Sequence, residues 1–151
     1  MKNKILIMVV FCSLFFSCKK AETKVGNSPS NQDQEVSTKE CYEYVKNKDT
    51  IQLKLNINSK TVSGQMTYKL YQKDKNEGII EGTMSGDTLF ADYKFLSEGS
   101  ESFRQVAFIK KNGKIIEVYG VVEEKNGKIV FKDKNKLILN SKFALNSVSC
   151  K

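Results

Sequence analysis

The stretch IQLKLNINSKTVSGQMTYKL, residues 51–70, alternates apolar and polar side chains in two runs that flank a short polar turn. The apolar positions fall on every second residue: Ile51, Leu53, Leu55 and Ile57, then Val62, Gly64, Met66, Tyr68 and Leu70. Successive side chains of a strand point to opposite faces of a sheet, so this period predicts two half-buried strands. The stretch therefore predicts an antiparallel hairpin with one face in a core.

The same two-residue period recurs along the rest of the chain. It covers Leu89, Ala91, Tyr93 and Phe95, and later Ile116, Val118, Gly120 and Val122. Residues 103–109 and 129–131 are apolar on both faces, so the pattern does not tell which side of these strands is buried.

Turn residues separate these runs at short intervals. Asn112-Gly113 and Asn126-Gly127 each stand between two lysines and two apolar runs, which is the strongest short hairpin signal. Further turns are predicted within residues 74–78, 85–87 and 97–100. We therefore predict an all-β fold, an antiparallel meander of eight or nine strands. A closed up-and-down barrel of the lipocalin-like kind is favoured, with a β-sandwich as the alternative.

The N-terminus has the anatomy of a secretory signal. Two lysines flank Asn3, and an apolar run extends from Ile5 to Phe16. A bilayer-spanning helix needs about 20 apolar residues, so this run is too short for a permanent anchor. The segment Leu14-Phe15-Phe16-Ser17-Cys18 resembles a bacterial lipobox, in which a small residue precedes the cysteine that receives the lipid. The resemblance implies a signal peptide over residues 1–17 and lipidation of Cys18.

Composition divides the remaining chain into two parts. Residues 19–38 contain no aromatic side chain and the only proline, so residues 18–38 are interpreted as the lipidated cysteine and a flexible tether. Residues 39–151 form the single predicted β domain. Cys41 and Cys150 are the cysteines left in it, and the oxidising envelope favours a disulfide between them, worth roughly 4–5 kcal/mol. Two free thiols or a metal-binding pair are the alternatives.

The composition also bears on the kind of function. The chain has a net charge of +8 and no histidine, so histidine-dependent catalysis and histidine-ligated metals are excluded. We predict no enzyme activity, no cofactor, no metal and no nucleic-acid partner. A simple meander would collect most of the basic charge at one end, from seven lysines and two aspartates: Lys60, Asp87, Lys110, Lys111, Lys114, Lys132, Asp133, Lys134 and Lys136.

The segment 97–104, SEGSESFR, holds the candidate binding residues. Glu98 and Glu101 lie close to Arg104, which is the only arginine in the chain. The planar guanidinium fork suits either carboxylate or an anionic ligand, and a surface turn closed by an ion pair is the plain alternative. The aromatic residues Tyr68, Tyr93, Phe95, Phe108 and Phe131 would line a ligand cavity or simply fill the core.

Taken whole, the chain resembles the small membrane lipoproteins of Bacteroidetes-type bacterial envelopes. The likeness rests on the lipobox, the polar tether, the segment Cys41–Tyr44, the segment Gly86–Leu89 and Cys150. It implies a protein anchored by lipid to a membrane, in first place the outer membrane, with its domain in the periplasm or at the cell surface. A non-catalytic binding module for a small apolar ligand or an envelope protein is expected, and lysozyme inhibitors offer an analogy. A structural or assembly lipoprotein without a pocket is the alternative.

Overall fold

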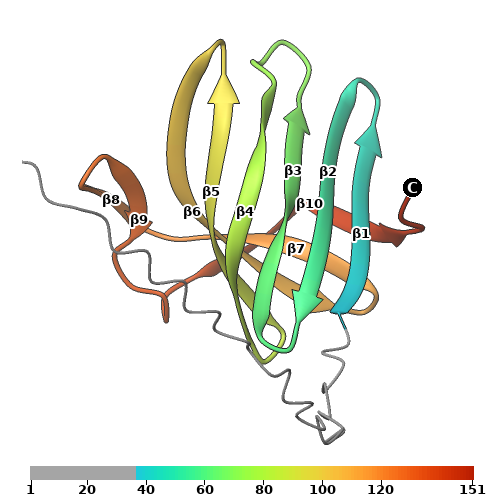
Figure 1. Ribbon diagram of the computed structural model, residues 1–151. Helices are drawn as coiled ribbons and strands as arrows, with labels where there is room; N and C mark the ends of the chain where they lie inside the picture. Colours follow the sequence, from blue (N-terminus) through green and yellow to red (C-terminus); the bar gives the residue numbers. More distant parts are fainter. Residues whose placement is uncertain (1–36) are drawn as a thin grey trace, which may run out of the picture. The chain divides into compact units, whose positions relative to one another are not determined.

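The computed structural model describes residues 37–151, apart from the side chains of residues 140 and 141. Signal peptide, Cys18 and most of the predicted tether lie outside these residues. Ten strands follow one another along the described chain (Figure 1): β1 Ser37–Lys46, β2 Asp49–Asn58, β3 Thr61–Lys69, β4 Asn76–Ser85, β5 Thr88–Ser97, β6 Ser100–Lys111, β7 Lys114–Tyr119, β8 Val122–Lys125, β9 Lys128–Phe131 and β10 Ile138–Val148.

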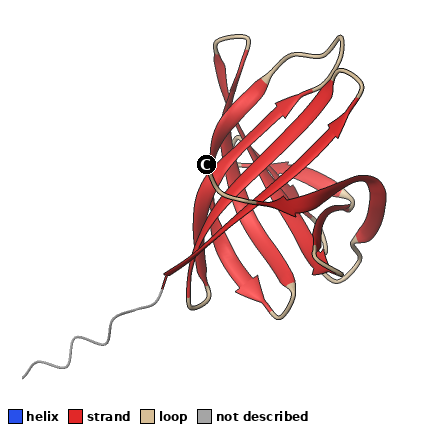
Figure 2. Cartoon of the chain, turned by 90° about the vertical axis from the view of Figure 1, so that its right-hand side faces the viewer, coloured by secondary structure: helices blue, strands red, loops and turns tan. Residues whose placement is uncertain are grey.

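Eight of these strands form a closed antiparallel barrel. Strands β1 to β7 pair in order, and β10 closes the circle between β7 and β1. The predicted all-β fold and the predicted closed barrel are confirmed, and the sandwich alternative is not observed. The strands cross at an incline and their turns collect at two ends (Figure 2), as closure of a sheet requires.

The two ends of the barrel are named here by their turns. The upper rim carries the turns after β1 and β3 and the β5–β6 turn, which are residues 47–48, 70–75 and 98–99. The lower rim carries the turns 59–60, 86–87 and 112–113, at the bottom of Figure 1. Both Asn-Gly hairpins form as predicted. Asn112 and Gly113 have φ of 54° and 70°, the left-handed pair that a type I′ turn needs.

Glycines allow β4 to bend around the barrel. A Cβ atom on Gly78 would overlap the carbonyl oxygen of Lys94, and one on Gly82 would overlap that of Phe90. Both carbonyls belong to β5, the neighbouring strand. A side chain at either position would therefore push β5 away from β4 and open the barrel wall.

The predicted inward faces are confirmed for β2, β3 and β5. Ile51, Leu53 and Leu89 are completely buried. The prediction for residues 116–122 is wrong, because this stretch is not one strand. β7 ends at Tyr119 and its inward side chains are Ile115, Glu117 and Tyr119, whereas Val118 is buried on the outer side. The outer side is covered by the chain that follows β9, which brings Leu137 against Gly120.

The hairpin of β8 and β9 lies outside the closed barrel. β9 pairs in parallel with β6 at a single position, Arg104 with Ile129, and the Phe131 amide donates to the Gln105 side chain at 3.1 Å. The connection from β9 to β10 then runs along the outer wall, where Lys134 lies over the Phe90 ring. Residues 132–136 therefore belong to this outer-wall connection and not to a turn between two barrel strands, which corrects the predicted grouping of charge.

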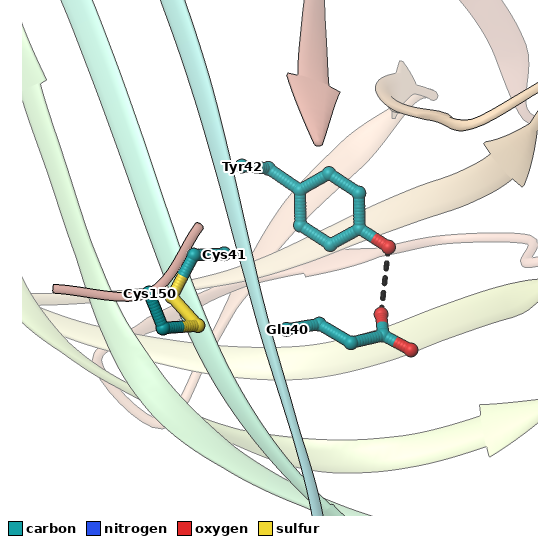
Figure 3. Close-up of a disulfide and its surroundings, with 4 residues drawn as sticks. All are labelled: Glu40, Cys41, Tyr42 and Cys150. Carbon is teal, nitrogen blue, oxygen red and sulfur yellow. Dashed lines mark hydrogen bonds between the residues drawn. A yellow bond between two sulfur atoms is a disulfide. The ribbon is translucent and has the colours of Figure 1, made fainter. Parts of the chain in front are cut away.

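The predicted disulfide is confirmed. Cys41 of β1 and Cys150, just after β10, are bonded across 109 positions of sequence. Cys41 points to the outer side of β1, opposite its neighbours Glu40 and Tyr42 (Figure 3). Only three residues of β1 pair with β10, Cys41 to Glu43, so the disulfide reinforces the shortest joint of the barrel.

Candidate ligand site at the upper mouth of the barrel

Large side chains fill the middle of the barrel. Tyr93 and Phe108 are completely buried, and Tyr68 is 6% exposed. Phe95 packs against this core from its upper side, whereas Phe131 belongs to the external hairpin. Of the two interpretations of the aromatic residues, core packing holds for Tyr93 and Phe108. A small-molecule site inside the barrel must therefore lie at one of its ends.

An ion pair with a buried carboxylate lies inside the upper end. The guanidinium of Arg104, from β6, stands 3.9 Å from the carboxylate of Glu117, from β7. Glu117 is only 4% exposed and is the one buried charged residue of the described chain. The hydroxyl of Tyr119, two residues further along β7, donates to the same carboxylate at 2.9 Å. The 3.9 Å between Arg104 and Glu117 is too long for a hydrogen bond, so these two side chains attract each other by charge alone.

Three aromatic rings fix the guanidinium of Arg104. Its central carbon lies 5.1 Å from the ring centre of Tyr68 and 5.6 Å from those of Tyr93 and Phe95. Tyr93 and Phe95 stack on one another with ring centres 4.7 Å apart. The negative ring faces attract the cation and limit its movement, so the unused guanidinium donors have a set direction.

Several polar atoms of the upper mouth have no hydrogen-bond partner. They are Nε of Arg104, Oδ1 of Asn76 and the hydroxyl of Tyr68, all of them buried. The Tyr68 hydroxyl is close enough to Glu117 for the carboxylate to influence it, but no hydrogen bond of normal geometry forms. An unpaired buried polar group costs about 1–3 kcal/mol, so this cluster is poised to accept water or a ligand.

An open cavity of about 350 Å³ adjoins these atoms. Its walls are Tyr68, Leu70, Lys73, Asp74, Asn76, Ser97 and Arg104. The β3–β4 loop on one side is held in place, since the Tyr71 amide donates to the Asp49 carboxylate at 2.6 Å and the Lys73 amide to the Leu70 carbonyl at 3.1 Å. The volume is at the low end for small-molecule sites and suits a small ligand.

The tyrosines of the site keep their protons at physiological pH. Burial raises the pKa of Tyr68 and of Tyr119 well above the ordinary value of 10, and the negative charge of Glu117 raises both further. Burial also raises the pKa of Tyr93, against the opposing charge of Arg104. The Tyr68 hydroxyl can thus donate or accept, whereas Arg104 only donates and the Asn76 oxygen only accepts.

The lower end of the barrel holds a related but tighter group. Lys110 of β6 contacts the carboxylate of Glu40 at 2.6 Å, and the Tyr42 hydroxyl donates to it at 2.6 Å (Figure 3). Burial raises the pKa of Glu40, but the hydrogen bonds from Lys110 and Tyr42 and the charge of Lys110 outweigh it, so the pKa lies below its ordinary value. The Glu40 carboxylate, the Lys110 ammonium group and the Tyr42 hydroxyl therefore all have a partner at this end.

The structure separates the three residues proposed from the segment 97–104. Glu98 occupies the β5–β6 turn with φ of 49°, in the left-handed region. Glu101 points outward and pairs with Lys94 at 2.9 Å, while Arg104 points into the barrel. Arg104 therefore pairs with neither Glu98 nor Glu101, and of the three residues it alone lines the cavity.

Glu117, Tyr119 and Asn76 were not identified from the sequence. Glu117 interrupts an apolar run at Ile115-Ile116-Glu117-Val118, and a charged residue in such a run is the signal that could have marked it. Its partner Arg104 lies on another strand. The pairing of β6 with β7, in which Ala107 lies opposite Val118, cannot be predicted from either segment alone. Asn76 carried no signal, because it appeared within a predicted turn.

No family model matches the chain, and no curated protein or solved structure is detectably similar to it. Within residues 37–151, no cluster of three or more cysteine or acidic side chains could hold a metal ion. The same part of the chain has no helix with the length and apolar character that a membrane crossing requires.

Proposed function

We propose that this protein is a lipid-anchored envelope lipoprotein whose β-barrel binds a small polar molecule, without catalysis, at its upper mouth. The observation that carries the proposal is the cavity of about 350 Å³ beside unpaired polar atoms of Arg104, Asn76 and Tyr68. The lipobox-like segment at Cys18 supports the anchor, and the lack of histidine in the chain supports a non-catalytic role.

The chemistry of the cavity favours a polar ligand over the apolar one expected from the sequence. The charges at the mouth balance, since Lys73 and Arg104 face Asp74 and Glu117. The unpaired atoms include a donor on Arg104 and an acceptor on Asn76, so a matching ligand offers both kinds of group. Hydroxyl and amide groups meet this requirement, and a purely apolar molecule would leave the buried atoms unpaired.

Native mass spectrometry tests this proposal on the chain from residue 18 onward, carrying Cys18→Ser to prevent lipidation, expressed in an oxidising periplasm and purified without detergent. We expect a stoichiometric small-molecule adduct that leaves on denaturation. Arg104→Lys keeps the charge but removes the planar fork, so the adduct should be lost or reduced at least tenfold. Lys110→Arg, the matched change at the opposite end, should retain it. An adduct that persists in Arg104→Lys, or none in the parent protein, contradicts the proposed site.

A protein-binding or structural role is the second candidate, and one surface favours it. Exposed apolar side chains occur after the end of β7, in the β8–β9 hairpin and at the start of β10: Val121, Val122, Ile129, Ile138 and Leu139. Val121 and Ile138 are 70% and 71% exposed, which is costly unless a partner covers them. If this candidate holds, Val121→Asp with Ile138→Asp abolishes cross-linking to an envelope protein and leaves the adduct intact.

A further inference from the structure

The lower rim presents an arc of lysines without acidic partners. Lys60, Lys111 and Lys114 are exposed, and among the described residues no carboxylate forms an ion pair with them. Lys110 differs, because Glu40 neutralises it inside the barrel. Asp87 is the one acidic residue in the three lower turns. The outward charge of this rim is therefore positive.

Backbone hydrogen bonds join the lower turns into one surface. The Met84 amide donates to the Lys60 carbonyl at 2.8 Å, and the Lys110 amide to the Asp87 carbonyl at 2.9 Å. Each turn is thus tied to the next strand pair around the barrel. The lysines are carried by a rigid frame, which lets them act together on a flat charged surface.

A depression of about 460 Å³ opens on this rim. It is lined by Tyr42, Asp87, Lys110, Lys111, Asn112, Gly113 and Lys114. Three of the seven lining residues are lysines, and Tyr42 of the lower group also lines it. A shallow, basic and polar hollow of this kind accommodates phosphate oxygens better than apolar groups.

The direction of β1 connects this rim to the N-terminal segment. Ser37, the first residue of β1, pairs with Asn58 directly before the lower turn at residues 59–60. The chain therefore enters the barrel at the lower rim. Eighteen positions, residues 19–36, separate Cys18 from Ser37. The tether predicted from composition would, at that length, span about 23 Å on average, so an anchor at Cys18 would hold the lower rim near the membrane.

From these observations we infer that the lower rim docks on anionic phospholipid headgroups, with Lys60, Lys111 and Lys114 as the contact residues. The candidate ligand mouth at the upper rim then faces away from the membrane. The orientation rests on the proposed lipid anchor, but the attraction between the rim and the headgroups does not. The two can therefore fail separately.

Vesicle co-sedimentation tests the inference. The chain from residue 18 onward, carrying Cys18→Ser to prevent lipidation, is mixed with vesicles of phosphatidylcholine alone or with 25% phosphatidylglycerol. Each lysine near an anionic surface contributes about fivefold in affinity, so Lys60→Gln/Lys111→Gln/Lys114→Gln should weaken binding to the anionic vesicles about a hundredfold. The matched variant Lys46→Gln/Lys48→Gln/Lys69→Gln removes the same charge from the upper rim and should weaken binding less than fivefold.

Two results overturn the inference. Equal losses in the two triple variants would show that net charge, and not the lower rim, attracts the protein to the vesicles. Binding of the parent chain that is no stronger to anionic than to neutral vesicles would exclude headgroup docking altogether. The thermal unfolding midpoint of each variant shows that it is folded. Metabolic labelling of wild-type Cys18 with palmitate reports separately on the anchor.

Discussion

The two ends of the barrel interior are built from the same three kinds of side chain. Strand β6 supplies a cation at each end, Arg104 above and Lys110 below, and each cation meets a glutamate from another strand. Each glutamate, Glu117 or Glu40, also accepts a hydrogen bond from the tyrosine two residues further along its own strand. The composition of the two groups is therefore nearly equal.

Their geometry is not equal. The lower ion pair closes at 2.6 Å with both side chains about a quarter exposed, whereas the upper pair stands at 3.9 Å around a carboxylate that is 6% exposed. The lower group satisfies its partners, while the upper group leaves Nε of Arg104 unpaired next to a cavity. Equal residue types thus produce a fully paired group at one end and a group with unpaired polar atoms at the other.

Removing the cation at each end should give the largest contrast. Arg104→Met leaves Glu117 buried without its counter-charge and is expected to lower the free energy of unfolding by about 3–5 kcal/mol. Lys110→Met leaves Glu40 partly in water and should cost about 1 kcal/mol. Urea denaturation followed by circular dichroism measures both. Equal losses would mean that the two ion pairs contribute equally to the stability of the fold.

A double substitution should recover most of the loss at the upper end. Arg104→Met combined with Glu117→Leu replaces a buried ion pair by apolar side chains, an exchange that is often neutral or stabilising. We expect the double variant to be about 2–4 kcal/mol more stable than Arg104→Met alone and to form no adduct. If stability does not return, the loss in the single variant comes from packing of Arg104 on its aromatic rings rather than from charge.

Removing a tyrosine hydroxyl at each end should give a smaller difference in the free energy of unfolding. Tyr119→Phe leaves one oxygen of the buried Glu117 without a donor, at an expected cost of about 1–2 kcal/mol. Tyr42→Phe should cost less than about 1 kcal/mol, because Glu40 keeps Lys110 and reaches water. The same unfolding measurement applies to both. A larger cost for Tyr42→Phe than for Tyr119→Phe would mean that Glu40, and not Glu117, depends more on its tyrosine donor.

The pH dependence of the lower pair should give the smallest effect. Because the pKa of Glu40 in the folded protein lies below its ordinary value of 4.5, the ionised carboxylate stabilises the fold above that pH. This contribution is lost as the pH falls through the lowered pKa. The stability difference between the wild type and Glu40→Gln, about 1 kcal/mol at pH 7, should therefore shrink as the pH falls below 4.5 and Glu40 becomes protonated. A difference that stays constant from pH 7 to pH 3 would rule out this linkage.

Local pattern was enough to predict the strands and their turns. The alternation in residues 51–70 places Leu53 and Met66 on one face, and the Asn112-Gly113 turn needs only two residues to define a hairpin. Each of these signals acts between neighbours in sequence, which is why the barrel could be predicted from them. The Cys41–Cys150 bond joins distant residues, and it was predicted because these are the two cysteines left in the β domain of a chain expected to be exported.

The candidate site could not be predicted in this way, because it depends on contacts between distant strands. Arg104 was identified because it is the only arginine. Of its predicted neighbours, Glu98 lies in the β5–β6 turn, and Glu101 points to the opposite face of β6, where it pairs with Lys94. Its true partner Glu117 is set by where β7 ends and by the hairpin that follows outside the barrel. The predicted inward face of residues 116–122 failed for the same reason, since β7 ends at Tyr119 and residues after β9 pack against Gly120.

The disulfide between Cys41 and Cys150 has a mechanical consequence. It encloses nearly the whole domain in one covalent loop, so a force applied through Ser37 and Lys151 acts on only a few residues outside that loop. The 109 positions between the cysteines are shielded from extension, which would otherwise lengthen the chain by about 380 Å at roughly 3.5 Å per residue. While this bond is intact, a pull between the two ends of the domain cannot unravel the barrel strand by strand.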